Sequence, residues 1–275
     1  MQNNNDIIIK KFPYSYVKTF KKLPQSSTRR GVMVNVELRK KIKNLKIPRK
    51  VLPKNFDYLI FLGYSGLSSF GINKKSSNVN LIGSFINPIQ YYVGLGNDDA
   101  ILHRFRIENK WNIVCYDLKR LFEILSKGNV DYFPSLFLSK DNIIYESQEW
   151  KRLKANIDIF KSLMFPMRVN IIVNELINHN LLGTKELLYT ATLVNMGIEY
   201  IKTGNITVDR YKVDVKIFNK IKENKYNIEI KEVINKSLND LKALINKSKL
   251  RHFPDGEKIN RLLTSIILNF NKERE

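Results

Sequence analysis

The fold is decided by a stretch that reads Tyr58-Leu59-Ile60-Phe61-Leu62-Gly63-Tyr64-Ser65-Gly66-Leu67-Ser68-Ser69-Phe70-Gly71 and, a few residues later, Ser77-Asn78-Val79-Asn80-Leu81-Ile82-Gly83. Two short apolar runs, residues 58–62 and 79–83, flank a segment rich in glycine and serine. Apolar runs of this length, bounded by turn residues, are typical of buried strands. The stretch therefore predicts two strands joined through a glycine-containing turn.

The sequence on the C-terminal side changes gradually from strand to helix patterns. Residues 111–116 predict a third strand, and residues 117–125 predict a helix that stops at Gly128. Helical periodicity dominates beyond about residue 146, in the segments 148–163, 167–178, 184–201, 213–222, 230–248 and 257–270. The predicted class is α/β, with a small mixed sheet and helices followed by an all-helical C-terminal part. We expect a basic arm (1–54), an α/β domain (55–145) and a helical domain (146–275).

The N-terminal arm carries most of the excess positive charge. The chain of 275 residues has 47 lysines and arginines against 26 acidic residues, a formal net charge of +21. The arm has fifteen basic and two acidic residues, hence +13. Nucleic acid is the commonest partner of such a surface, with an anionic membrane or an acidic protein as alternatives. The residues predicted to bind nucleic acid are Lys10, Lys11, Lys18, Lys21, Lys22, Arg29, Arg30, Arg39, Lys40, Lys41, Lys43, Lys46, Arg49 and Lys50.

Cysteine content and the N-terminus bear on the compartment. Cys115 is the only cysteine, which excludes an intrachain disulfide and a cysteine-based zinc cluster within one chain. The first residues lack the apolar core of a signal peptide, and no apolar run approaches the length of a membrane span. We expect a protein that is neither secreted nor transmembrane and that resides in the cytoplasm or within a virion.

The spacing of the two asparagines resembles that of a metal-binding strand. Phosphoryl and nucleotidyl transfer by two metal ions uses two carboxylates at i and i+2 on one strand and a third on a neighbouring strand. A glycine-serine turn before that strand holds the nucleotide phosphates through its backbone amides. This chain has the glycine-serine turn and the strand that follows it, but Asn78 and Asn80 stand at the positions of the two carboxylates.

On these residues the chain resembles the nucleotidyltransferase superfamily, and within it the RlaP-like family of bacteria and phages. Residues 65–71 match the family's S-G-S-x-A-Y-G turn, and residues 77–88 match its S-D-V-D-type strand and the segment that follows. Weaker likeness, in family order, runs from about Phe56 to Phe270 and excludes the arm. The resemblance implies a nucleotidyltransferase fold, with magnesium and a nucleotide as the cofactor and substrate of active members.

The departures from the family pattern lie where catalysis would occur. Leu67 replaces the turn serine after Gly66, and Asn78 and Asn80 replace the two aspartates. The strand that would supply the third carboxylate has Asn112 and Val114 instead. The family's Lys-His-x-x-His-x-x-Arg helix reads Lys-Glu-Leu-Leu-Tyr-Thr-Ala-Thr over residues 185–192. An uncharged amide is a poor magnesium ligand, so we expect no catalytic residue, no metal and no cofactor.

Several other residues have side chains that could serve a functional role. The asparagines could instead be ordinary turn residues of a different fold. Asp117, or the pair Asp98 and Asp99, could be relocated catalytic acids, although adjacent residues of an extended segment point to opposite sides. Three widely separated histidines, His103, His179 and His252, lack the spacing of a metal site and are expected to be structural or on the surface. Cys115 is expected to be a packed side chain.

The function that follows is that of an inactive nucleotidyltransferase-like protein that serves as a structural or nucleic-acid-binding subunit of a larger assembly. The family's frequency in phages suggests a phage or viral setting. One alternative is an active nucleotidyltransferase that modifies RNA or protein with relocated metal ligands. A second alternative is a protein-binding scaffold without nucleic acid.

Overall fold

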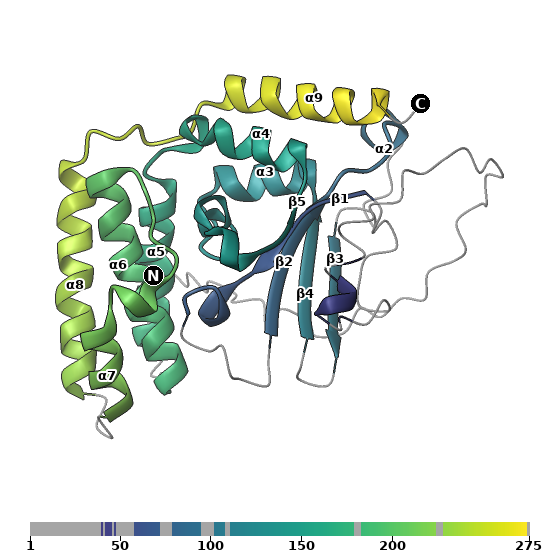
Figure 1. Ribbon diagram of the computed structural model, residues 1–275. Coiled ribbons are helices and arrows are strands. Elements are labelled where there is room, and N and C mark those ends of the chain that lie inside the picture. The colour runs from purple at the N-terminus through teal and green to yellow at the C-terminus, as the bar shows by residue number, and fades with distance from the viewer. Residues whose placement is uncertain are drawn as a thin grey trace, which may run out of the picture. The chain divides into compact units, whose positions relative to one another are not determined.

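The computed structural model describes residues 40, 42–45, 47, 58–71, 79–94, 102–107, 111–178, 183–223 and 228–273. Contacts divide the chain into residues 1–32 and 33–275, and all the described residues belong to the second unit. The predicted class is confirmed, because a mixed sheet with helices is followed by a helical C-terminal region (Figure 1). The predicted domain boundaries at residues 54 and 145 stay predictions.

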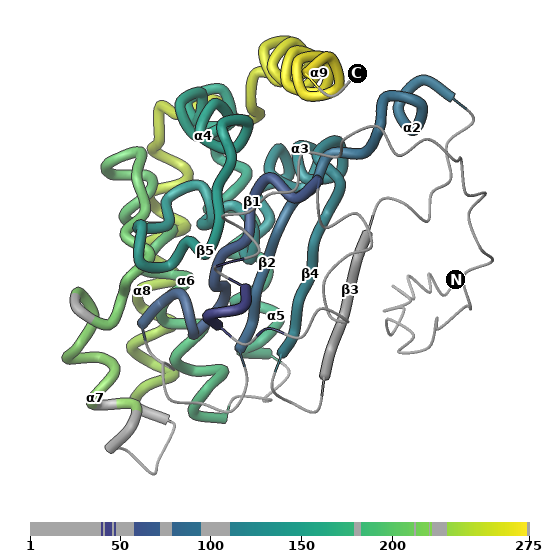
Figure 2. Tube along the Cα trace, turned by 45° about the vertical axis from the view of Figure 1, so that its right-hand side comes forward, coloured from purple at the N-terminus to yellow at the C-terminus, as the bar shows by residue number. Residues whose placement is uncertain are grey.

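The sheet has five strands in the order β3-β4-β2-β1-β5. Their bounds are β1 (Leu59–Tyr64), β2 (Val79–Phe85), β3 (Leu102–Ile107), β4 (Trp111–Asp117) and β5 (Ile143–Glu146). β2 and β4 are parallel, whereas the pairs β1/β2, β1/β5 and β3/β4 are antiparallel. The end of β1 therefore meets the start of β2, and the parallel pair brings the start of β4 to the same edge. Figure 2 shows β1, β2 and β4 side by side in the centre of the sheet.

Each face of the sheet carries its own hydrophobic cluster. Alternation along β4 sends Trp111, Ile113 and Cys115 to one face, where the buried Ile42 and Ile47 also pack. The opposite face belongs to the larger core, in which the ring of Phe61 stacks on the indole of Trp150 with 3.9 Å between their centroids. The helices therefore cover the face that also bears Asn80 and Asn112.

Helices follow the predicted segments closely. Their bounds are α2 (Gln90–Val93), α3 (Leu118–Ser126), α4 (Gln148–Ala155), α5 (Met164–Asn178), α6 (Thr184–Thr203), α7 (Val215–Glu223), α8 (Ile228–Lys247) and α9 (Gly256–Lys272). Side-chain caps begin three of them: Asp117 accepts from Lys119 N in α3, Ser147 from Trp150 N in α4 and Asp255 from Lys258 N in α9. Within the described residues, no helix is long and apolar enough to cross a membrane.

One predicted helix is shorter than the sequence indicated. Periodicity predicted a single helix over 148–163, but α4 ends at Ala155 and a 3-10 turn follows over Ile157–Phe160. The side chain of Asn156 explains the break, because its Nδ2 donates to the carbonyl of Arg152 at 2.9 Å. This local hydrogen bond competes with continuation of the helix.

Candidate functional site

Four of the residues singled out from the sequence, Gly66, Leu67, Asn80 and Asn112, lie at one edge of the sheet. Gly66 and Leu67 lie in a 3-10 turn (Gly66–Ser68) directly after β1, and the backbone N–H of Ser65 donates to the carbonyl of Asn80 at 3.0 Å. Asn80 is paired with Asn112 in the register of β2 and β4. The expected frame of turn, first strand and neighbouring strand is therefore present. Asn78 lies outside the described residues.

Asn80 and Asn112 bind each other. Nδ2 of Asn112 donates to Oδ1 of Asn80 at 3.0 Å, and both side chains are partly buried. The oxygen of Asn80 is thus engaged by an amide at the position where two carboxylates would need a cation between them. The residues present do not fit a magnesium ion, since magnesium binds proteins chiefly through carboxylates. Among the described residues, no three histidine, cysteine or acidic side chains gather into a metal-binding group.

The strand β4 distinguishes between the two candidates for the third carboxylate position. Asn112 lies opposite Asn80, whereas Val114 lies opposite Ile82 and packs against the larger core. The carbonyl of Val114 accepts a hydrogen bond from the hydroxyl of Tyr132 at 2.6 Å. Asn112 therefore lies beside Asn80, whose backbone contacts the turn, whereas Val114 packs against the core.

The turn keeps the glycine of the family pattern but not its serine. Gly66 has a φ of +56°, a conformation that glycine adopts without the steric cost that a side chain incurs. Leu67, at the position of the family's serine, packs against the core. The hydroxyl of Ser69 is used internally, since it donates to the carbonyl of Gly66 at 2.8 Å. What the turn still offers a ligand is its backbone and the partly exposed side chains of Ser65 and Ser68.

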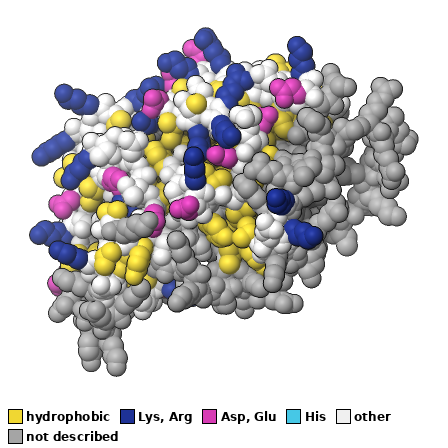
Figure 3. Space-filling view, in the orientation of Figure 1, with side chains coloured by type: hydrophobic (Ala, Val, Ile, Leu, Met, Phe, Trp, Pro, Cys, Tyr) yellow, Lys and Arg dark blue, Asp and Glu magenta, His cyan; other side chains and the backbone are white. Residues whose placement is uncertain are grey.

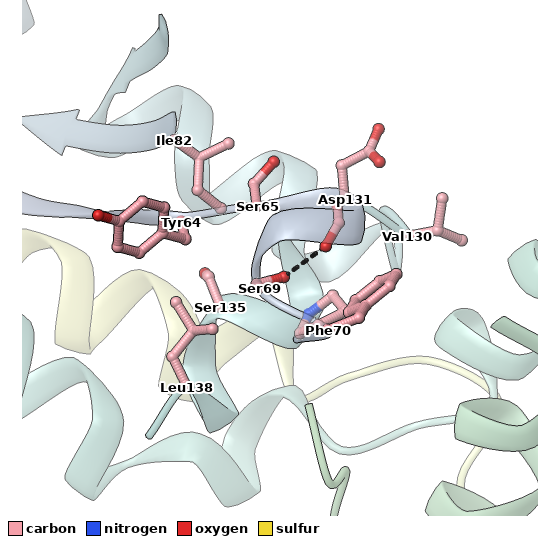
Figure 4. A pocket seen from close by; sticks show the side chains of 11 residues that line it. Tyr64, Ser65, Ser69, Phe70, Ile82, Val130, Asp131, Ser135 and Leu138 are labelled. Atoms are coloured by element: carbon pink, nitrogen blue, oxygen red, sulfur yellow. Dashed lines mark hydrogen bonds between the residues drawn. The ribbon is translucent and has the colours of Figure 1, made fainter. Parts of the chain in front are cut away.

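A small pocket lies beside this turn (Figure 4). Its walls come from the turn and from the segment after α3, and the close-up shows Ser65 and Asp131 on one side with Leu138 on the opposite side. The lining residues are Tyr64, Ser65, Gly66, Ser69, Phe70, Ile82, Val130, Asp131, Pro134, Ser135 and Leu138. The hydroxyl of Ser135 is buried without a hydrogen-bond partner.

Asp131 is an acid that sequence reasoning missed. It is exposed at the pocket, and its Oδ1 accepts from the hydroxyl of Tyr189 at 2.8 Å. Burial and the nearby carboxylate raise the pKa of Tyr189 well above its usual value, so this tyrosine remains a neutral donor. Asn129 orients Asp131 through a bond from Asp131 N to Asn129 Oδ1. The turn of Gly128 and Asn129, already visible in the sequence, was the signal that could have located this acid.

Asp117 lies away from the turn, at the other end of β4. Its Oδ2 accepts from the hydroxyl of Tyr92 at 2.5 Å and from Nδ2 of Asn87 at 3.1 Å, and its Oδ1 caps α3. Burial raises the pKa of Asp117, and burial beside this carboxyl also raises the pKa of Tyr92. Asp117 is thus a structural cap within a buried cluster, remote from the position of a relocated catalytic acid.

Of the remaining candidate residues, the structure describes only some. Cys115 is buried in the sheet, and burial raises the pKa of its thiol to about 12, so it is a packed neutral side chain. Asp98, Asp99, His179 and twelve of the predicted nucleic-acid-binding residues lie outside the described residues, and so does the side chain of His103. Lys40 and Lys43 are described and exposed.

The basic side chains outside the arm are distributed among acidic ones. Figure 3 shows dark-blue lysines and arginines over the face that it displays, with magenta acidic side chains among them. Several form ion pairs, such as Arg120 with Glu123 at 2.6 Å and Lys154 with Glu146 at 3.0 Å. The described surface is therefore less one-sided in charge than the arm.

Comparison with known families agrees with this geometry. The model of the RlaP family, described as an RNA repair pathway DNA polymerase beta family, matches residues 34–164. The resemblance to this nucleotidyltransferase-like family is confirmed. No curated protein matches the chain significantly. The RlaP match begins inside the basic arm, earlier than expected, and ends where α5 begins. The matched residues include the sheet, the turn and both asparagines of the pair, Asn80 and Asn112.

Proposed function

We propose that this RlaP-like chain is a catalytically inactive nucleotidyltransferase-like protein that binds nucleic acid as a subunit of a larger assembly. The observation that carries the inactivity is the hydrogen bond between Asn112 and Asn80. It replaces a pair of like charges, which would need a metal ion, by two neutral groups that satisfy each other. The side chain of Leu67 supports the same reading, because it packs into the core rather than facing a phosphate.

The charge distribution supports nucleic acid as the partner. The arm has a formal charge of +13, and its C-terminal part is anchored by the buried Ile42 and Ile47 while Lys40 and Lys43 remain exposed. Cations on an anchored segment can bind phosphates by displacing condensed counterions. The family's occurrence in phages suggests a viral setting, either in the infected cytoplasm or in the virion.

The test is binding of the full chain to single-stranded and duplex oligonucleotides over a range of salt concentrations. We expect the logarithm of the affinity to fall steeply and linearly with the logarithm of salt. Lys40→Gln with Lys43→Gln should reduce that slope by about 2 units on duplex DNA. The matched control is Lys127→Gln with Lys140→Gln, which removes two exposed charges from outside the arm and should leave the slope unchanged.

Two results would favour the alternative functions, one in this binding test and one in a nucleotide-transfer assay. Weak binding that does not respond to salt would overturn nucleic-acid binding and favour a protein-binding scaffold. Transfer of a labelled nucleotide to RNA or protein in the presence of magnesium would overturn inactivity. Asp131 would then be the first residue to substitute, since its carboxylate lines the pocket beside the turn.

A further inference from the structure

A tyrosine of the helical region lies directly against the glycine turn. The backbone N–H of Tyr211 donates to the carbonyl of Phe70 at 2.9 Å. On its other side Phe70 faces Tyr189, with 6.2 Å between the ring centroids. The segment around Tyr211 thus contacts Phe70, one of the residues that line the pocket beside the turn, although it comes from far along the chain.

Buried charges hold this segment in place. Arg210 is 4% exposed and forms two bonds with Asp214, from Nε at 2.7 Å and from Nη2 at 2.9 Å. Its Nη1 also binds Glu199 of α6. A bidentate pair fixes direction as well as distance, so the residue that follows Arg210 has a defined orientation.

Tyr211 presents a supported ring to solvent. It is 41% exposed, and its ring lies nearly parallel to that of the fully buried Phe218, at 19° and 6.3 Å between centroids. Val213 and Val215 beside it are also exposed, at 58% and 37%. Three exposed apolar side chains within five residues form a surface that a partner can cover.

The charges of this segment favour nucleic acid over an apolar protein surface as the occupant. Two acids bound this segment, Asp209 beside the glycine turn and Glu223 at the end of α7, and between residues 210 and 222 the acidic residue is Asp214, which Arg210 already pairs. The other charged residues there are all lysines: Lys212, Lys216, Lys220 and Lys222. Lys216, in the first turn of α7, is exposed. An aromatic ring flanked by lysines is the arrangement that binds unpaired bases and their phosphates.

We propose that Tyr211 is a stacking platform for a base of single-stranded nucleic acid that passes the glycine turn, with Lys216 contacting the strand's phosphates. This inference rests on the proposed nucleic-acid binding and adds a second contact surface to the arm. Base stacking on an aromatic ring tolerates any sequence. The platform therefore implies a preference for single strands over duplexes, without a preference for particular bases.

The experiment measures the affinity of the full chain for fluorescent single-stranded and duplex oligonucleotides at fixed salt. Tyr211→Ala and Tyr211→Leu should weaken single-strand binding about tenfold and leave duplex binding unchanged. Tyr211→Leu keeps apolar packing on Phe218, so it covers the case in which the alanine variant fails to fold. Tyr211→Phe keeps the ring and should bind as the wild type does. Lys216→Gln should lower the salt slope on single strands by about 0.7.

The experiment distinguishes failure of the stacking platform from failure of the proposed nucleic-acid binding. A wild-type chain that binds no oligonucleotide would overturn the proposed function together with the platform. Wild-type binding that Tyr211→Leu leaves unchanged would overturn the platform alone and would assign the apolar surface of Tyr211, Val213 and Val215 to a protein partner. Equal losses in Tyr211→Phe and Tyr211→Leu would also overturn it, because the hydroxyl rather than the ring would then matter.

Discussion

Replacing the asparagine pair of β2 and β4 by carboxylates should make the stability of the fold depend on magnesium. In Asn80→Asp with Asn112→Asp, two carboxylates would replace groups whose contacting atoms are 3.0 Å apart. Two charges about 4 Å apart at an effective dielectric constant of about 20 repel by about 4 kcal/mol. Both positions are partly exposed, so solvent screening should reduce the loss of unfolding free energy to about 1–3 kcal/mol at pH 7.

Magnesium and acid should each restore part of this loss. A site with a dissociation constant of about 1 mM would regain about 1.4 kcal/mol in 10 mM magnesium. Repulsion raises the pKa of one carboxyl in the folded state above its unfolded value. Stability is then lost as pH rises through the raised pKa, and it returns as pH falls below that value.

The assay is urea unfolding with and without magnesium, between pH 5 and pH 8. The control variant Asn260→Asp with Asn269→Asp makes the same charge change at exposed positions of α9 and should show no magnesium effect. The reasoning would be refuted if the wild type gained as much stability from magnesium as the carboxylate variant does.

Two further predictions concern the fold around the site. Gly128 has a φ of +62°, and a Cβ there would lie 2.4 Å from backbone atoms of Met164 and Phe165, so Gly128→Ala should lose about 3 kcal/mol of unfolding free energy. Gly256→Ala, with no atom within 4 Å of the new Cβ, should stay within about 1 kcal/mol of the wild type; equal denaturation midpoints for the two variants would contradict this. Because burial raises the pKa of Asp117, the wild type should lose stability relative to Asp117→Asn as pH rises from about 4 to 7, and a constant gap in urea unfolding would disprove it.

The spacing of apolar residues along the chain predicted three of the five strands and most of the helices. The strands at 59–64, 79–85 and 111–117 and the C-terminal helices were visible as periodic apolar residues. β3 and β5 were missed because β3 has arginines in its centre and β5 is four residues long. Each is stabilised by pairing with a strand that the patterns did predict, β3 with β4 and β5 with β1, but no local pattern identifies the pairing itself.

The candidate site was predictable as far as the family resemblance reached. The resemblance located the turn and both asparagines of the pair, whereas the hydrogen bond between them depends on the parallel register of β2 and β4. Asp131 and Tyr211 were missed because they reach the turn through tertiary contacts, from the loop after α3 and from the segment before α7. The turn of Gly128 and Asn129 marks the segment of Asp131 in the sequence, but local periodicity does not show which distant segments contact the glycine turn.

The most direct test of inactivity is a calorimetric titration of the purified full chain with ATP, CTP, GTP and UTP, with and without magnesium. We predict no magnesium-dependent binding of any of the four, because neutral amides stand at the positions that the family resemblance assigns to the metal ligands. Nucleotide binding that appears only with magnesium would contradict the account, since it would require metal-binding carboxylates at a site where we find Asn80 and Asn112.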